Sequence, residues 1–173
     1  MYEAFLIQLV GFVAWIFLAL SYWRKKVDDV LLLQVISCIL FVIHYYFLDG
    51  MSGLYIVLFE TVRDFVYYKS KDDLKLFFYS IPIYIIIGIL NFTGIMSILP
   101  SLASMIDGFS LANKKMIVVG GGIASYTVWF IYDVYVGSIS GAITDFILIV
   151  SNIFVIITEY KERNRRKRIK KLA

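Results

Sequence analysis

Residues 139–171 read ISGAITDFILIVSNIFVIITEYKERNRRKRIKK, an apolar run followed by a basic one. The apolar part, residues 139–158, is long enough to cross the hydrocarbon core of a bilayer as one helix, which takes about 20 residues. Eight Lys or Arg residues lie within 161–171, and basic residues beside a span stay on the cytoplasmic side. This stretch therefore predicts a membrane-spanning helix whose C-terminal end lies in the cytoplasm.

The rest of the chain has a similar composition. Of its 173 residues, 61% are hydrophobic, and the mean hydropathy is +0.82. A soluble domain of this size has too little polar surface to cover such an apolar total. Six further spans are predicted, at residues 4–23, 30–48, 51–68, 75–93, 96–112 and 116–136. Because backbone polar groups in lipid must be paired within their own segment, the prediction is an all-α integral membrane protein of seven transmembrane helices.

The short loops orient these helices. With seven spans, the loops at 24–26, 69–75 and 114–115 lie on the same side as the C-terminus, and they hold every other Lys and Arg except Arg63. The opposite loops hold none. Because basic loops stay in the cytoplasm, the N-terminus is predicted outside and the C-terminus inside. Aromatic residues at the helix ends, such as Tyr45–Tyr46, are interpreted as anchors at the membrane surface.

The chain also contains an internal repeat. Lys25–Lys26 after the first span recur as Lys114–Lys115 after the fifth, and the turn Gly50–Gly53 recurs as Gly137–Gly141. One span separates the two halves, so both have the same orientation and are related by an axis along the membrane normal. The predicted layout is two parallel triple-helix bundles, 4–68 and 96–158, a linker helix, 75–93, and a basic cytoplasmic tail, 159–173.

Two stretches carry a family resemblance. Phe41–Arg63 reads FVIHYYFLDGMSGLYIVLFETVR, and Trp129–Asn152 reads WFIYDVYVGSISGAITDFILIVSN. In each, aromatic residues precede a Gly-containing turn and an acidic residue follows it, and the pair resembles the bacterial YgjV-type inner-membrane proteins. The resemblance implies the bacterial plasma (inner) membrane and a three-one-three layout similar to that of SWEET and PQ-loop transporters. The chain departs from these patterns in having Glu60 where a small polar amide is expected, and in having only Pro82 and Pro100 as prolines.

Polar side chains within the predicted spans are the candidates for function, since a charge at a helix centre costs about 2.5–3.5 kcal/mol. Glu60 follows Ser52 of the outer turn by eight residues, or about 12 Å of helix, which places it near the middle of the bilayer. Asp145 and Asn152 are seven residues apart and share a helix face. A substrate or proton pathway is predicted along Glu60, Asp145, Asn152, His44, Asp107 and Trp129.

Several of these residues also have a structural interpretation. Arg63 is predicted to form a structural ion pair with Glu60, with Asp64 near the cytoplasmic interface. If Glu60 does not pair, it would hold a proton instead. His44 is interpreted either as a hydrogen-bonded residue of a helix interface or as a substrate contact or proton relay.

Three other features have competing interpretations. Gly120–Gly122 remove side chains over almost a full turn, which permits either close helix packing or the approach of a ligand to the backbone. Asp133 lies near enough to the outer surface to be merely hydrated. The tail is predicted to anchor the chain in the cytoplasm and to bind anionic lipid, whereas the absence of interleaved aromatic residues disfavours nucleic acid.

These features favour a transporter or facilitator that moves a small polar solute, passively or coupled to protons. The sequence contains no nucleophile–base motif, phosphate loop, haem ligand pair or zinc spacing, so neither an enzyme nor a metal or other cofactor is predicted. The alternative is a non-transporting membrane scaffold or accessory subunit whose buried charges only pair. A third interpretation is a vitamin uptake protein of the nicotinamide-riboside type. Whether copies associate into a homo-oligomer stays open.

Overall fold

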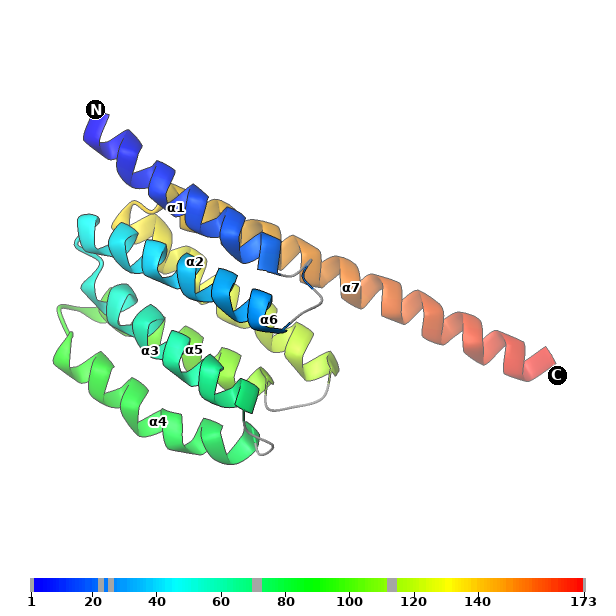
Figure 1. Cartoon of the computed structure of the whole chain (residues 1–173). Helices are drawn as coiled ribbons and strands as arrows, with labels where there is room; N and C mark the ends of the chain where they lie inside the picture. The colour runs from blue at the N-terminus through cyan, green and yellow to red at the C-terminus, as the bar shows by residue number, and fades with distance from the viewer. Residues whose placement is uncertain (1, 22–23, 25–26, 70–72, 112–114, 173) are drawn as a thin grey trace.

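The computed structural model describes residues 2–21, 24, 27–69, 73–111 and 115–172. These residues form seven α-helices and one 3₁₀ helix, with no strand among them (Figure 1). The helices are α1 (Tyr2–Ser21), α2 (Val27–Phe47), α3 (Met51–Lys69), α4 (Asp73–Leu90), η1 (Ile95–Ile98), α5 (Leu99–Leu111), α6 (Lys115–Val136) and α7 (Ile139–Leu172). The all-α prediction is therefore confirmed for this part of the chain.

Most helix boundaries lie within a few residues of the predicted ones, and the fifth and seventh helices differ most. The predicted span 96–112 begins in η1, which follows Gly94 at a φ of 151°, and α5 proper begins only at Leu99. Helix α7 has 34 residues, so it is about 51 Å long, whereas the hydrocarbon core is about 30 Å thick. The predicted tail is thus largely a continuation of α7, which projects beyond the bundle in Figure 1.

Six of the helices form a closed ring. Consecutive helices pack side by side, with α1 on α2, α2 on α3, α5 on α6 and α6 on α7. The ring closes where α3 contacts α5 and where α7 contacts α1, while α4 packs outside the ring against α3 and α5 (Figure 1).

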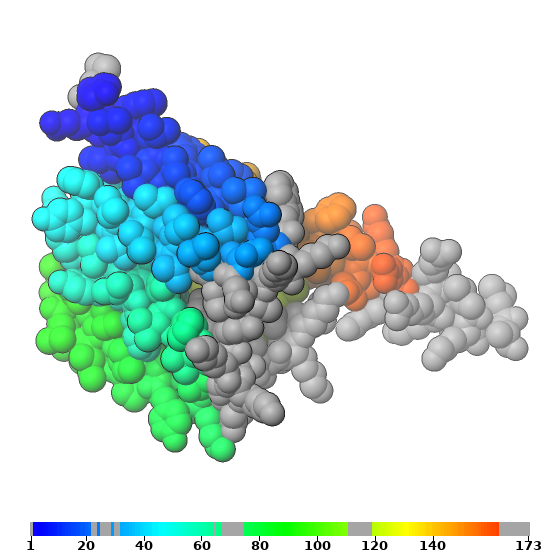
Figure 2. Space-filling model, viewed as in Figure 1, coloured from blue at the N-terminus to red at the C-terminus, as the bar shows by residue number. Residues whose placement is uncertain are grey.

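The outer surface is largely apolar. Side chains such as Leu90, Ile95 and Phe154 are 78%, 77% and 69% exposed, and α1 to α4 form one continuous face of the molecule (Figure 2). Within the described residues, two helical segments are long and apolar enough to cross a membrane on their own, Tyr2–Ser21 and Ile139–Glu162. An apolar exterior of this extent needs lipid around it.

Small residues allow the helices to approach closely inside the bundle. A Cβ atom at Gly121 of α6 would overlap Ser110 of α5, whereas Gly120 has no atom nearby. Serine hydroxyls also donate to backbone carbonyls of the neighbouring helix, as in Ser125 Oγ to Ala103 O at 2.9 Å. Such contacts are the usual means of helix association in lipid, where the hydrophobic effect between helices is absent.

Candidate functional site

A cavity of about 200 Å³ lies inside the helix ring. Its lining comes from α1, α2, α3, α6 and α7, so residues far apart in the sequence meet there. Three of the lining residues are acidic, Glu60 of α3, Asp133 of α6 and Asp145 of α7, and no Lys, Arg or His belongs to the described lining. The site is therefore a small space inside the bundle with carboxyl groups on both sides of it.

The two aspartates of the cavity are almost completely buried. Asp133 is 2% exposed, and its Oδ1 accepts a hydrogen bond of 2.7 Å from the hydroxyl of Tyr45. Asp145 is 8% exposed, and its Oδ2 has no hydrogen-bond partner within the described protein. A buried carboxylate oxygen without a partner is costly, so Asp145 is the group in this cavity that most needs a ligand.

Aromatic side chains also belong to the lining. The rings of Tyr45 and Trp129 are stacked, with centroids 6.1 Å apart and an interplanar angle of 27°. The rings of Phe41 and Tyr45 are also stacked, with centroids 6.5 Å apart, and Tyr126 lies one turn before Trp129 on α6. The cavity thus presents aromatic rings as well as carboxyl groups to whatever enters it.

A constant sequence spacing relates the two sides of the cavity. Tyr45 and Asp133, which contact each other directly, are 88 positions apart. The same spacing joins four more pairs of lining residues, namely Cys38 with Tyr126, Phe41 with Trp129, Val57 with Asp145, and Glu60 with Leu148. Equivalent positions of α2 and α6, and of α3 and α7, therefore face the same space.

Hydrogen bonds outside the cavity follow the same spacing. His44 Nε2 lies 3.3 Å from Ser140 Oγ. Tyr132 comes 88 positions after His44, and Ser52 comes 88 positions before Ser140. These two residues are joined by a hydrogen bond of 3.0 Å. Ser37 Oγ also donates to the Ala14 carbonyl of α1 at 2.8 Å. Ser125, 88 positions later, donates to the Ala103 carbonyl of α5, although these two acceptors are 89 positions apart. The contacts of α2 with α7 and of α3 with α6 are thus reciprocal.

His44 lies in a polar cluster beside the cavity and is fully buried. Its Nδ1 is 2.8 Å from the carbonyl oxygen of Ile7; because a carbonyl only accepts, Nδ1 carries the proton. Its Nε2 is 2.9 Å from Ser138 Oγ, and Ser138 also hydrogen-bonds Asp133. A chain of hydrogen bonds therefore runs from α1 through His44 and Ser138 to the cavity.

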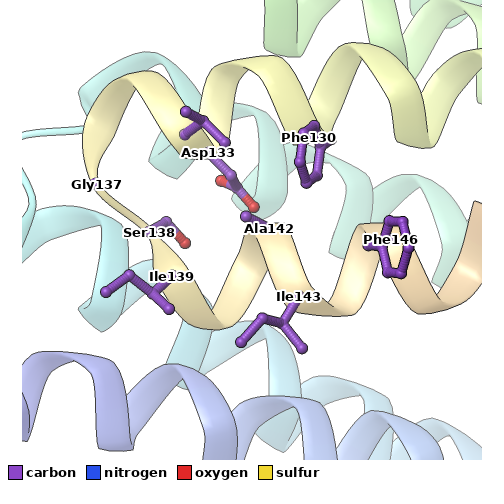
Figure 3. Close-up of a pocket in the computed structure, with 9 residues that line it drawn as sticks. Phe130, Asp133, Gly137, Ser138, Ile139, Ala142, Ile143 and Phe146 are labelled. Carbon is purple, nitrogen blue, oxygen red and sulfur yellow. The ribbon is translucent and has the colours of Figure 1, made fainter.

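A second hollow, of about 400 Å³, lies between α6 and α7. Figure 3 shows Asp133 pointing from α6 toward the start of α7, close to Ala142. The remaining lining is mostly apolar and includes Ile139 and Phe146, which are 58% and 59% exposed on the outside of the bundle. This hollow is thus a groove in the outer surface, and Asp133 belongs to the lining of both this groove and the interior cavity.

Arg63 belongs to a different buried cluster, between α3, α4 and α5. It forms an ion pair of 3.3 Å with Asp107, and its Nη1 donates to the hydroxyl of Tyr84 at 2.6 Å. The Arg63 side chain is 4% exposed and that of Asp107 23%. The ion pair seen for Arg63 is therefore with Asp107; the pair with Glu60 stays a prediction, and the side chain of Asp64 lies outside the described residues.

Three of the six predicted pathway residues line the cavity, and the other three lie elsewhere in the bundle. Glu60, Asp145 and Trp129 line the cavity. His44 and Asp107 lie in the two polar clusters beside it, and the amide of Asn152 lies against Gly122 of α6. The structure thus brings three of the six together in one space.

From the sequence alone, two of the lining residues, Asp133 and Tyr45, were expected to lie at the membrane surface. Asp133, expected to be merely hydrated, is buried, and Tyr45, expected to be a surface anchor, is 4% exposed, whereas its neighbour Tyr46 is 57% exposed. Both expectations were wrong because position along a helix gives depth but not the direction of the side chain. The 88-residue spacing is the sequence signal that links the two residues.

A lipid-facing helix ring around a small acidic cavity defines an α-helical integral membrane protein. The chain belongs to the Imp-YgjV family, described as bacterial inner membrane proteins, whose model matches residues 5–163. The predicted family and membrane are thereby confirmed. No curated protein and no solved structure matches the chain.

Proposed function

We propose that this protein crosses the inner membrane seven times, with its N-terminus outside, and carries a small polar solute through the cavity between two parallel triple-helix repeats. The repeats are 4–68 and 96–158, and the helix at 75–93 links them. The observation that carries the proposal is Asp145, a buried acidic group whose Oδ2 has no partner in a cavity inside the bundle. Ionisable groups within membrane segments generally mark solute or proton pathways.

The reciprocal contacts support the repeat. In a two-fold arrangement, residue i of one half contacts residue j of the other, and the equivalent of j contacts the equivalent of i. His44 with Ser140 and Tyr132 with Ser52 have this relationship. In transporters built from repeats, the substrate site lies at the repeat interface near the bilayer midplane, which is where this proposal places the cavity.

The cavity volume limits the solute. Pockets for drug-sized ligands measure about 300–1,000 Å³, and this one measures about 200 Å³. The solute is therefore a small metabolite that either moves passively or is coupled to protons through the carboxyl groups. The proposal needs no catalysis and no cofactor, and the basic end of α7 would hold anionic lipid at the cytoplasmic surface.

A non-transporting scaffold is the second candidate, and the Arg63 cluster is the observation that favours it. There, each charge has a protein partner, as a purely structural role requires. Asp145 does not fit that pattern, because its Oδ2 has no protein partner. The transporter therefore accounts for both sites, and the scaffold for only one of them.

Uptake by proteoliposomes tests the proposal. Purified wild-type protein, Asp145→Asn and the matched control Asp49→Asn would be reconstituted and supplied with a panel of labelled sugars, amino acids, vitamins and amines. Asp49 is exposed and lies in the outer turn at a φ of 53°, a conformation that Asn tolerates well. We expect one class of solute to enter liposomes that contain the wild-type protein or the control. The same solute should not enter liposomes that contain Asp145→Asn. Uptake of every solute at the level of empty liposomes would contradict the proposal.

A further inference from the structure

We propose that the solute is a small organic cation, an amine or a quaternary ammonium compound. This inference rests on the proposed transport function and names the chemical class of its substrate. It follows from the charge of the cavity, from the spacing of its acidic groups and from its aromatic lining.

The charge of the cavity selects the sign of the solute. Glu60, Asp133 and Asp145 supply three carboxyl groups, and the described lining includes no basic side chain. An anion would be repelled, and a neutral solute would leave Asp145 without a counter-charge. A cation supplies the partner that Asp145 Oδ2 lacks within the protein.

The spacing of the acidic groups favours an organic cation over a metal ion. Among the described residues, no three His, Cys, Asp or Glu side chains converge closely enough to hold a metal ion. The carboxyl groups instead come from three different helices, α3, α6 and α7. A molecular cation spreads its charge over several atoms and can face more than one of them.

The aromatic lining supplies the second recognition element. The faces of Trp, Tyr and Phe attract cations, and clusters of such rings are the usual receptors for quaternary ammonium groups. Trp129, Tyr45 and Phe41 all line the cavity, and Tyr45 stacks with each of the other two rings. Carboxyl groups together with stacked aromatic rings fit a cation that also has an apolar surface, such as a trimethylammonium group.

Cys38, the only cysteine of the chain, lines the cavity and makes a test possible without any added label. Its rate of modification would be measured in purified protein with the cationic reagent 2-(trimethylammonium)ethyl methanethiosulfonate and with the anionic reagent 2-sulfonatoethyl methanethiosulfonate. Each rate would be divided by the rate of the same reagent with free 2-mercaptoethanol. We expect the normalised rate to be at least tenfold higher for the cation. Asp145→Asn should reduce this ratio, and Asp49→Asn should leave it unchanged.

Protection by choline tests the aromatic contribution. Choline should slow modification of Cys38, whereas its neutral carbon isostere 3,3-dimethylbutan-1-ol should not, and Trp129→Leu should abolish the protection. Thermal stabilisation by choline, measured on the same variants, shows whether each is folded and gives a second readout of binding.

Equal normalised rates for the two reagents, or equal protection by the two alcohols, would overturn the cation assignment. If a labelled neutral or anionic solute nevertheless entered proteoliposomes in an Asp145-dependent way, the proposed transport function would stand without the cation assignment. If Cys38 reacted with neither reagent and no solute entered, both would be wrong.

Discussion

The hydroxyl of Tyr45 donates a 2.7 Å hydrogen bond to Oδ1 of Asp133, and the two residues are 88 positions apart in the chain. In the proposed repeat they occupy equivalent positions, so this contact lies where the two halves meet on their common axis. The same two side chains line the cavity. The Tyr45–Asp133 contact thus joins the proposed repeat architecture to the proposed solute site.

Replacing Tyr45 with Phe should destabilise the protein. The change removes the hydroxyl and leaves a buried carboxyl with one hydrogen bond fewer, at an expected cost of about 1–2 kcal/mol in the free energy of unfolding. Chemical unfolding in mixed micelles measures this. The matched control is Tyr46→Phe, because Tyr46 is adjacent and exposed; equal stability losses for the two variants would contradict the role assigned to the hydrogen bond.

The glycines of α6 give a second test of the packing. A Cβ atom at Gly121 would overlap Ser110 of α5, whereas one at Gly120 would meet nothing within 4 Å. We expect Gly121→Ala to cost about 1–3 kcal/mol through overpacking, and Gly120→Ala to be neutral or stabilising by up to about 1 kcal/mol, because Ala is the better helix former. If the order of the two melting temperatures were reversed, the packing of α5 on α6 would be wrong.

The Arg63–Asp107 pair should be structural. Asp107→Asn removes the carboxylate that pairs with the buried Arg63 guanidinium at 3.3 Å, and breaking a buried pair in this way typically costs about 3–5 kcal/mol. Combining it with Arg63→Gln should recover much of the loss, because both charges are then absent. Unfolding free energies of the two single variants and the double variant form the cycle; a double variant as unstable as the sum of the singles would show that the two residues do not interact.

Hydropathy and basic-loop patterns predicted the number of helices and most of their boundaries, because apolar length and charge are local properties of the chain. They did not predict that α5 starts late, where Gly94 has a positive φ, or that α7 continues as a helix far beyond its apolar part. A count of apolar residues contains no information about the backbone conformation of one glycine or about the helix propensity of a charged segment.

The site was only partly predictable for a related reason. The depth of Glu60 and Asp145 follows from their position along a helix, and both line the cavity. The direction of a side chain depends on which helices are neighbours, and that is a tertiary property. Sequence position therefore did not predict that Asp107 pairs with Arg63 between α5 and α3, nor that Tyr45 and Asp133 line the cavity.

Topology is tested by single cysteines in a Cys38→Ser background. Cysteine at Tyr2 or Ile95 should react with an impermeant maleimide added to intact cells, and cysteine at Arg165 should react only after the membrane is opened. The reason is the concentration of Lys and Arg on one side of the predicted spans, which holds that side in the cytoplasm. Labelling of position 165 in sealed cells would reverse the orientation.

Access to Cys38 from the two sides of the membrane tests the central claim, that the cavity is a solute pathway. Right-side-out and inside-out vesicles, each with a thiol scavenger sealed inside, would be treated with 2-(trimethylammonium)ethyl methanethiosulfonate, and modification of Cys38 would be measured by mass spectrometry, with Cys38→Ser as the blank. A pathway that opens to both sides predicts modification in both kinds of vesicle. Modification in neither, or in only one of them, would contradict the account.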